Sequence, residues 1–530
     1  MAAGRGGPRS LCGVSCYRFS GASCHDVGGI LMDVVAHIHA GQPTETSWRF
    51  QLDEMAWRDL VEGLKHDSLP FVGLWCDGAA VHALFMPHGT QPLAASLILE
   101  DRRYPALSPA RPVSSLYERM IFDLYGVEAM WATDVRPLVD HDVWADTMPL
   151  AAVPGGAGSN KGMLTFQPSE AMLEVGGVTA GSGPASGGRE APLHIALALD
   201  GDVIRYAETV TGYAHRGMAQ RLQTCRVEDA NRLSGRYVAG ACAAHQAAFC
   251  RAVEAACGET IGPEVSLLRV VVLELERVST HLFTLAGIAR QAGAVLVASR
   301  CMWFREKLLT EAAPIIGSRL MMDHCVPGGV TLRTTAAMGE LCSKLAELGE
   351  EIYPDLVTLW QSYPGLSSRL VGLGIVESAL LEQVGLDGPV ARAGGGDCDY
   401  RRDMRAYDGL WRFTSGRHDG TVEDRAIVLL EEVGESLRML NIAGPKLGLS
   451  AGGRIDLYYE DGEGIGMAEG PWGAVLYWVR LKNGRVEHAF VRDPAYSALL
   501  ALEAVLPGQN VADLGLIRAS LGVTASALDG

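Results

Sequence analysis

The alternation of hydrophobic and polar residues predicts mixed strands and helices in the first third of the chain. Residues 48–66 begin like a strand and continue with apolar positions at helical spacing. Residues 71–78 and 80–89 alternate as two strands around Asp77-Gly78, a hairpin-like turn. Residues 93–100 follow as a third strand. This segment is therefore expected to form a small α+β domain.

The remainder of the chain changes pattern twice. Residues 151–190 are rich in Gly and Ser, which is typical of a linker or a long loop. Residues 193–213 predict a hairpin, and long helical stretches then run to about Asn441. Residues 474–493 return to strands around the turn Asn483-Gly484. The predicted fold class is thus α+β, with a tail at 1–40, a first domain at 41–150, a linker at 151–190 and a mostly helical module with small β elements at 191–530.

Composition excludes some classes of function. The chain has 530 residues, 48% of them hydrophobic, and a formal net charge of −17. This charge argues against nucleic acid and anionic membrane surfaces as partners. No run of 18 or more apolar residues is free of charge, so no transmembrane helix is predicted. If the protein works at a membrane, other subunits must hold it there.

The 12 cysteines are scattered, and no pair has CxxC spacing. The usual zinc-ribbon and ferredoxin spacings are therefore absent. Scattered cysteines in a long chain indicate buried thiols in a reducing compartment. Cys12, Cys16 and Cys24 lie in a Gly/Ser/Arg-rich segment that is either a tail, a targeting segment or a metal-binding or redox trio. The chain also lacks a dinucleotide-binding fingerprint.

Four sequence blocks carry a family resemblance. They are GYAHRG at 212–217, GRYVAGACAAHQAAFC at 235–250, LELERVSTH at 273–281 and the segment 491–520. In this order they resemble the large subunit of [NiFe] hydrogenases, especially its energy-converting branch, and the quinone-site subunit of respiratory complex I. Residues 104–138 resemble the small peripheral-arm subunit of complex I, which is a docking domain without a cofactor. Fusion of the two types resembles the large subunit of formate-hydrogenlyase-type complexes.

The resemblance implies a metal site whose ligands are missing. The family binds nickel and iron through four thiolates from two CxxC pairs, which suit soft, redox-active metals. The positions correspond to Ala239 and Cys242 and, near the C-terminus, to Thr524 and Ala527. Only Cys242 is a cysteine. One thiolate cannot hold a nickel–iron pair, so no metal is expected in this chain.

Three more family positions have changed. Trp472 stands where the family has an Arg that supports the iron's ligands, and Ala474 stands where it has a Glu. The Glu that relays protons in hydrogenases should fall near Ala219. These departures predict that the protein is not a hydrogenase.

Tyr237 is the strongest remaining candidate for a catalytic residue. The quinone-site subunit of complex I also lacks the metal cysteines and has a Tyr at this position. A phenol can donate a hydrogen bond to a quinone carbonyl and deliver a proton during reduction. Alternatively, Tyr237 packs in an apolar helix with its hydroxyl satisfied. The family's second quinone contact, a His, should fall at Ser186, so the predicted headgroup site is incomplete.

Other charged residues have structural alternatives. One helical face carries Glu274, Arg277, Val278 and His281. This spacing allows a functional Glu–Arg pair beside a histidine. The alternative is a buried ion-pair network that only fixes the packing of the helix.

Glu118, Arg119 and Asp123 are predicted to form structural ion pairs, with Arg119 and Asp123 at i,i+4. Cys242 and His245 are either a reactive pair or buried packing residues.

The leading hypothesis is a subunit of a complex-I-like or hydrogenase-related membrane oxidoreductase. The resemblance implies electrons from a [4Fe-4S] cluster in an iron–sulfur small subunit, a quinone as acceptor, and membrane ion-translocating subunits as further partners. The chain would be cytoplasmic and peripheral on the inner face of the membrane, without a cofactor of its own. The residues proposed for catalysis are Tyr237, Arg236, His215 and Asp399. The alternative is a catalytically silent coupling component, with an active hydrogenase as a third hypothesis.

Overall fold

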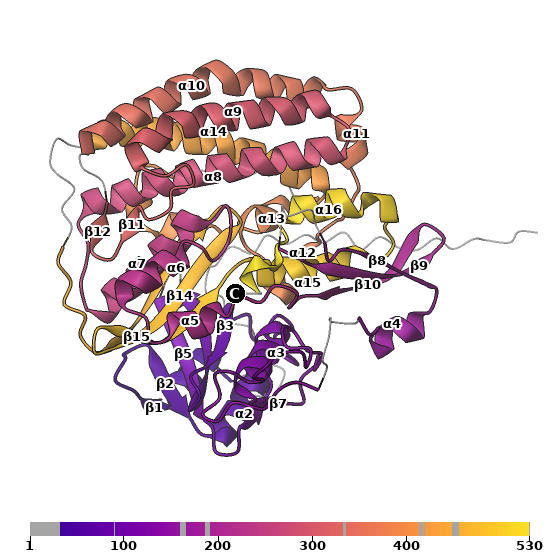
Figure 1. Ribbon diagram of the computed structural model, residues 1–530, viewed down its shortest axis with the longest axis vertical. Helices are drawn as coiled ribbons and strands as arrows, with labels where there is room; N and C mark the ends of the chain where they lie inside the picture. The colour runs from indigo at the N-terminus through magenta and orange to yellow at the C-terminus, as the bar shows by residue number, and fades with distance from the viewer. Residues whose placement is uncertain are drawn as a thin grey trace, which may run out of the picture.

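The structure, a computed structural model, contains a layer of long helices and several small sheets. It describes residues 32–88, 91–159, 166–185, 191–331, 335–412, 417, 419–447 and 455–528. The predictions made for Cys12, Cys16, Cys24 and Ser186 lie outside these residues. Figure 1 shows long helices stacked at one end, the N-terminal elements at the other end, and the C-terminal strands between them. The predicted α+β class is confirmed.

The N-terminal elements form a five-stranded sheet flanked by helices. The strand order is β1-β2-β5-β4-β3, with β2 parallel to β5 and the other pairs antiparallel. The strands are β1 (Gln42–Pro43), β2 (Arg49–Leu52), β3 (Phe71–Cys76), β4 (Ala80–His88) and β5 (Gln91–Ile98). The helices are α1 (Val34–His39), α2 (Glu54–Leu64) and α3 (Ser114–Tyr125), and a short parallel pair joins β6 (Arg103–Pro105) to β7 (Glu128–Met130). The predicted strand–helix segment, hairpin and third strand are all present.

The charged residues of α3 are structural, but their predicted pairing is wrong. Glu118 accepts hydrogen bonds from two backbone amides of the preceding loop at 2.7 and 2.8 Å. Asp123 accepts from two amides of the loop after β7, both at 2.8 Å. Arg119 instead pairs with Asp134 at 3.0 Å. The Arg119–Asp123 ion pair does not form because the carboxylate is already occupied by backbone donors.

The Gly-rich segment 151–190 contains regular structure that its composition did not predict. Helix α4 spans Glu170–Val175, and β8 (Val178–Ser182) forms the edge of a sheet with β9 (His194–Asp200) and β10 (Val203–Val210). Gly177 has φ +99°, and a Cβ there would lie 2.5 Å from a carbonyl oxygen of β9. Glycine is therefore required here by close strand packing as well as by a turn. The predicted β9–β10 hairpin is confirmed.

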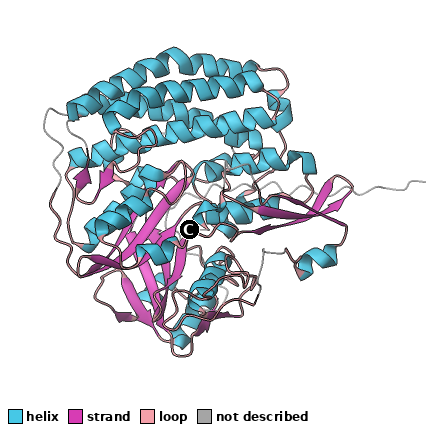
Figure 2. Cartoon of the chain, viewed as in Figure 1, coloured by secondary structure: helices cyan, strands magenta, loops and turns pink. Residues whose placement is uncertain are grey.

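Long helices form the layer seen at the top of Figures 1 and 2. They are α8 (Pro263–Gln291), α9 (Val295–Ile316), α10 (Thr335–Ser362) and α14 (Val422–Lys446). Pro263 starts α8, where its missing N–H costs nothing. Thr421 and Asp424 form a capping box at the start of α14. None of the described helices combines the length and apolar composition that crossing a bilayer requires.

Helix α7 (Cys242–Ala256) packs its small side chains directly on the C-terminal sheet. That sheet is antiparallel and consists of β13 (Gly462–Gly470), β14 (Gly473–Lys482) and β15 (Arg485–Arg492). A Cβ on Gly466 would lie 2.1 Å from the backbone nitrogen of Ala252, so only glycine allows this approach. The predicted turn Asn483-Gly484 is present, with φ values of +51° and +72°.

Shorter elements complete the module. The helices are α5 (Met218–Leu222), α6 (Val227–Ser234), α11 (Leu366–Leu370), α12 (Ser378–Val384), α13 (Gly388–Ala393), α15 (Ala495–Val505) and α16 (Leu514–Leu521). Two short strands, β11 (Cys325–Val326) and β12 (Gly329–Val330), pair beside them, and the 3-10 turns are Tyr400–Asp403, Arg405–Tyr407, Val511–Asp513 and Ala525–Ala527.

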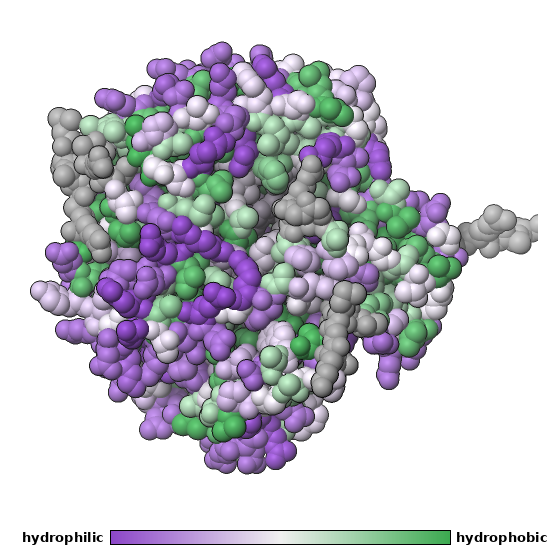
Figure 3. Space-filling view, in the orientation of Figure 1, coloured by the Kyte–Doolittle hydropathy of each residue, from purple (hydrophilic) through white to green (hydrophobic). Residues whose placement is uncertain are grey.

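The N-terminal sheet packs on the C-terminal sheet through aromatic rings. Trp75 of β3 stacks on Phe490 of β15 with centroids 4.9 Å apart and lies 5.1 Å from Trp478 of β14. On the face drawn in Figure 3, hydrophobic residues form small separate groups among hydrophilic ones.

Candidate functional site

The candidate site is built where three loops meet around Arg216. This residue lies in the loop before α5, and its guanidinium donates to three backbone carbonyls. The acceptors are the carbonyls of Arg236 at 2.8 Å, Tyr237 at 2.7 Å and Ser526 at 2.6 Å. Arg216 thereby joins the segment before α7 to the C-terminal segment. The two stretches in which the resemblance implies thiolate pairs therefore lie side by side.

The donor set at this junction does not fit a nickel–iron centre. Cys242 is buried at the start of α7, and its Sγ lies 3.8 Å from the carbonyl oxygen of Val238. Burial raises the pKa of this thiol to about 12, so it is protonated at neutral pH. The other three positions carry no thiol. Among the described residues, no group of three or more His, Cys, Asp or Glu side chains is arranged to hold a metal ion.

An indole occupies much of the space at the junction. The remaining cavity has a volume of about 20 Å³ and is lined by residues that include Val238, Trp472 and Thr524. The Trp472 ring packs against Gly522, since a Cβ on that glycine would lie 2.3 Å from the indole. A void of this size holds about one water molecule. The site therefore has neither the ligands nor the room of a metal centre.

Tyr237 lies in a loop that precedes α7 rather than in the helix predicted for residues 235–250. Its ring stacks on His245 with centroids 5.1 Å apart, and the Arg216 guanidinium lies 6.0 Å from its centroid. Burial raises its pKa above the ordinary value. Within the described part of the chain, no hydrogen bond reaches the Tyr237 hydroxyl. The phenol is thus held in place while its polar atom stays available.

Tyr237 borders a cavity of about 70 Å³ between the N-terminal domain and the helical module. Apolar and aromatic side chains line it, among them Tyr117, Leu124 and Phe490. A more open groove of about 350 Å³ shares Leu124 and Ala219 with this cavity. The groove and the cavity therefore lie on either side of shared lining residues, and only the cavity is bordered by Tyr237.

His245 is fixed on both sides of its ring. Its Nδ1 lies 3.0 Å from the Tyr477 hydroxyl and its Nε2 lies 3.1 Å from Asp493 Oδ2. The ring is fully buried. Of the two alternatives for Cys242 and His245, the structure matches buried residues rather than a reactive pair, because the His245 ring is bound to these two partners.

His215 and Arg236 lie next to the site but not in it. His215 stacks on Trp144 with centroids 4.7 Å apart and lines the open groove. Burial, with help from the charge of Arg216, lowers its pKa to about 4, so the imidazole is neutral. Arg236 forms a bidentate ion pair with Asp323 at the surface. The structure therefore separates Arg236 from its neighbour Tyr237.

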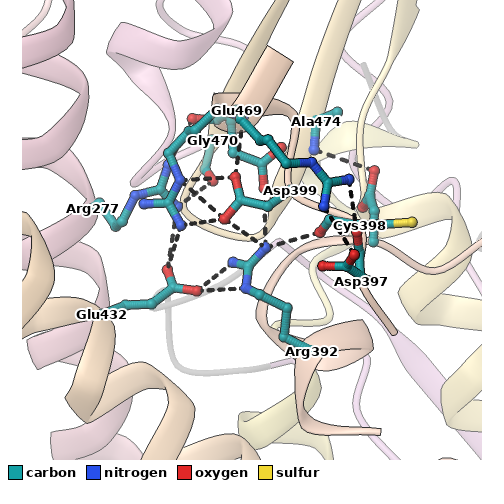
Figure 4. A network of polar contacts seen from close by, with 12 residues as sticks. Arg277, Arg392, Asp397, Cys398, Asp399, Glu432, Glu469, Gly470 and Ala474 are labelled. Atoms are coloured by element: carbon teal, nitrogen blue, oxygen red, sulfur yellow. Dashed lines mark hydrogen bonds and ion pairs between the residues drawn. The ribbon is translucent and has the colours of Figure 1, made fainter. Parts of the chain in front are cut away.

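Asp399 belongs to a second, buried network of charges. In Figure 4 it lies at the centre, with Arg277, Arg392, Glu432 and Glu469 around it. Asp399 accepts from Arg401 Nη2 at 2.6 Å and lies 3.3 Å from Arg392 Nη1. Burial alone would raise the pKa of Asp399, but the two arginines lower it below the ordinary value.

The predicted face of α8 joins the same network. Glu274 pairs with Arg277 at 3.2 Å and accepts from the Tyr407 hydroxyl at 2.8 Å. His281 Nε2 lies 3.0 Å from Glu432, which also accepts from Arg392 Nε at 2.9 Å. The predicted Glu–Arg pair with a nearby histidine is present, as part of a network that fixes α8, α13 and α14 together.

Sequence reasoning missed three acids that border the site. Asp493 lies in the segment 491–520 and Glu469 lies three residues before Trp472, but no local signal marked either acid. Asp387 precedes α13 and pairs with Arg492 at 2.7 Å. Their roles depend on distances between segments that the sequence alone does not give.

Comparison with known proteins finds similarity to hydrogenase components and to a subunit of respiratory complex I. Residues 291–455 match the family described as "Respiratory-chain NADH dehydrogenase, 49 Kd subunit". A "Carbon monoxide-induced hydrogenase" of Rhodospirillum rubrum is 27% identical, with 64% of this chain and 95% of that protein covered. One of the subunits of the NADH-quinone oxidoreductase of Salinispora tropica is 29% identical, with 66% and 92% covered.

A longer match and a solved structure extend the comparison. "Formate hydrogenlyase subunit 5" of Escherichia coli K12 is 26% identical, with 85% of this chain and 82% of that protein covered. A chain of an archaeal membrane-bound sulfane sulfur reductase has the same fold, with a TM-score of 0.61 and 20% identity, over 68% of this chain and all of that chain. The resemblance predicted from the sequence is therefore confirmed: the chain is related to hydrogenase large subunits and to the 49-kDa-type subunit of complex I.

Proposed function

We propose that this chain is a nickel-free subunit of a complex-I-like or hydrogenase-related membrane oxidoreductase, in which electrons from a partner's iron–sulfur cluster reach a quinone-type acceptor beside Tyr237. In this assignment the chain is peripheral on the inner face of the membrane and binds an iron–sulfur subunit and ion-translocating membrane subunits. The names of the relatives support the class of complex. The acceptor, the partners and the location are proposals.

The observation that carries the proposal is the placement of the Tyr237 phenol. It borders an apolar, aromatic-lined cavity that shares two lining residues with a more open groove. Arg216 and His245 hold it, and its hydroxyl has no hydrogen-bond partner among the described residues. A quinone reduced there would gain a hydrogen bond from the phenol and apolar packing around its ring.

One observation favours a second function, that of a catalytically silent coupling component. Trp472 fills the position of the ancestral metal site and leaves only about 20 Å³. The 70 Å³ cavity beside Tyr237 is also well below the size usual for ligand sites, so an acceptor has to displace side chains or use the groove. In this second function the chain only connects a partner's cluster to the membrane subunits.

Replacement of Tyr237 distinguishes the two functions. Tyr237→Phe removes the hydroxyl and keeps the ring, so assembly should be unchanged while quinone reduction by the purified complex falls 10-fold or more. Tyr458→Phe is the matched control, since that side chain is 85% exposed. Unchanged turnover in Tyr237→Phe supports the silent coupling function. Nickel and iron analysis of the same preparation should find iron without nickel, and stoichiometric nickel would overturn both proposals.

A further inference from the structure

Glu469 is a buried acid with no hydrogen-bond partner in the described structure. It lies near the end of β13 and is 1% exposed, and neither carboxylate oxygen makes a hydrogen bond. The nearest cation is Arg392, whose Nη1 lies 3.6 Å from Oε1. Arg277 is also close, but its guanidinium donates to the backbone carbonyl of Glu469 at 2.9 Å. The side chain is therefore buried without the donors that an ionised carboxylate requires.

The charge balance of the surrounding network leaves Glu469 as the surplus acid. Four arginines and four carboxylates around it form pairs: Arg277 with Glu274, Arg401 with Asp399, Arg392 with Glu432, and Arg492 with Asp387. Burial lowers the pKa of His281, which keeps that ring from supplying a fifth positive charge. An ionised Glu469 would therefore give the buried network an excess negative charge, and a neutral carboxylic acid would not.

The charged groups that face Glu469 also favour the neutral carboxylic acid. Burial, together with the nearby carboxylates of Asp399 and Asp387, raises its pKa, and Arg392 and Arg277 act in the opposite direction. The balance places its pKa at about 8. Cys398 and Tyr400 also lie within electrostatic range, and both are neutral at pH 7 because burial raises their pKa values.

The surroundings of Glu469 and of Tyr237 share polar residues around one small cavity. Glu469 pairs with Ala474 across β13 and β14, and the amide of Ala474 donates to Asp387 Oδ2 at 3.3 Å. Asp387 Oδ1 is buried without a hydrogen-bond partner in the described structure. Asp387 and Asp493 both line the 20 Å³ cavity, which has room for one water molecule.

On the far side of that cavity, Asp493 contacts His245, which stacks on Tyr237.

We propose that Glu469 is a proton-binding residue that holds a proton in the resting protein and exchanges it, through Asp387 and the water-sized cavity, with the Asp493–His245 pair. When the proton moves, Glu469 becomes a carboxylate and the Asp493–His245 pair gains that proton, so the buried region keeps its total charge. The use of this proton at Tyr237 rests on the proposed function. The protonated state of Glu469 is independent of that function.

Infrared difference spectroscopy of the full chain tests the resting state. The spectrum of the wild type minus that of Glu469→Gln at pH 7 should contain a carboxylic C=O band, and titration should remove it with a midpoint near pH 8. Glu463→Gln is the matched control on the same strand, because the Glu463 carboxylate, unlike that of Glu469, forms close ion pairs with Arg49 and Arg480. Its difference spectrum should lack the C=O band.

Absence of the Glu469 band at pH 7 overturns the proposal. If Glu469→Gln does not fold, the test uses wild-type protein labelled with ¹³C at the glutamate carboxyl. A C=O band that shifts with this label and titrates near pH 8 supports the proposal, and no such band overturns it.

Turnover tests the exchange step separately. Glu469→Gln should lower quinone reduction about 10-fold and remove the fall in rate above pH 8, whereas Glu463→Gln should change neither. One outcome shows that the exchange route is wrong. In it, the C=O band of Glu469 is present and Tyr237→Phe reduces quinone slowly, but Glu469→Gln reduces quinone at the wild-type rate. If both variants turn over normally, the proposed function fails and the proton-binding state of Glu469 stands.

Discussion

Replacement of Arg216 by Met should loosen the C-terminal segment selectively. Arg216 is the only described side chain that hydrogen-bonds the carbonyl of Ser526, at 2.6 Å. A hydrogen bond to a charged group contributes about 1.5–3 kcal/mol, and the part-buried position of Arg216 favours the lower half of that range. Since about 1.4 kcal/mol corresponds to a factor of ten, local opening should become roughly 10- to 30-fold easier.

Hydrogen exchange measures this opening directly. The reporters are the amides of Ser526, bonded to Thr524 Oγ1 at 3.2 Å, and of Leu528, bonded to the Ala525 carbonyl at 3.1 Å. In Arg216→Met both should exchange faster by that factor, while amides in the middle of α9 keep their rates.

The control is Arg221→Met, because Arg221 is exposed and, among the described residues, its side chain donates to no acceptor other than the carbonyl of Arg216. Equal exchange at residues 526 and 528 in Arg216→Met and wild type would refute the claim that Arg216 joins the segment before α7 to the C-terminal segment.

Further predictions concern packing, buried charge and pH. Gly522→Ala should cost a few kcal/mol in unfolding free energy, because φ is +66° and the Cβ would meet the Trp472 ring, and adding Trp472→Ala should reduce the extra cost. Arg269→Met should cost about 3–5 kcal/mol, measured by denaturant unfolding, because it leaves Glu254, 4% exposed, without its 2.6 Å ion pair. The raised pKa of Glu469 makes the native state bind a proton that the unfolded chain loses between about pH 4.5 and 8. Its contribution to stability therefore falls by up to about 1.4 kcal/mol per pH unit across that window, and thermal unfolding of Glu469→Gln from pH 5 to 8 should lack this decline.

Elements with a clear hydrophobic period could be predicted from the sequence. The strands β3, β4, β14 and β15 and the long helices carry that period in their own residues. Strands β8 and β13 could not be predicted, because their glycines are set by the close approach of another segment. A Gly-rich stretch has the same composition whether it is a loop or a strand under a helix.

The site was only partly predictable for the same reason. The motif at 215–217 drew attention to Arg216, but its three carbonyl partners come from distant segments. The sequence hypothesis places Arg236 among the proposed catalytic residues together with its chain neighbour Tyr237. In the loop that they share, Arg236 turns outward to Asp323, whereas Tyr237 turns inward. Adjacent residues in an irregular segment need not serve one site.

The buried charge network can persist without a metal for purely energetic reasons. Arg277 and Glu432 are both fully buried, so removing either one would leave an unpaired charge at a cost of about 3–5 kcal/mol. The positions that correspond to the family's metal ligands are not constrained by buried ion pairs in this way. Once thiolates are absent, an indole at Trp472 that fills the space stabilises the fold, because a large empty cavity is itself destabilising. The intact network is therefore no proof of catalysis, and the protonation state of Glu469 and the turnover of Tyr237→Phe are the observations that bear on it.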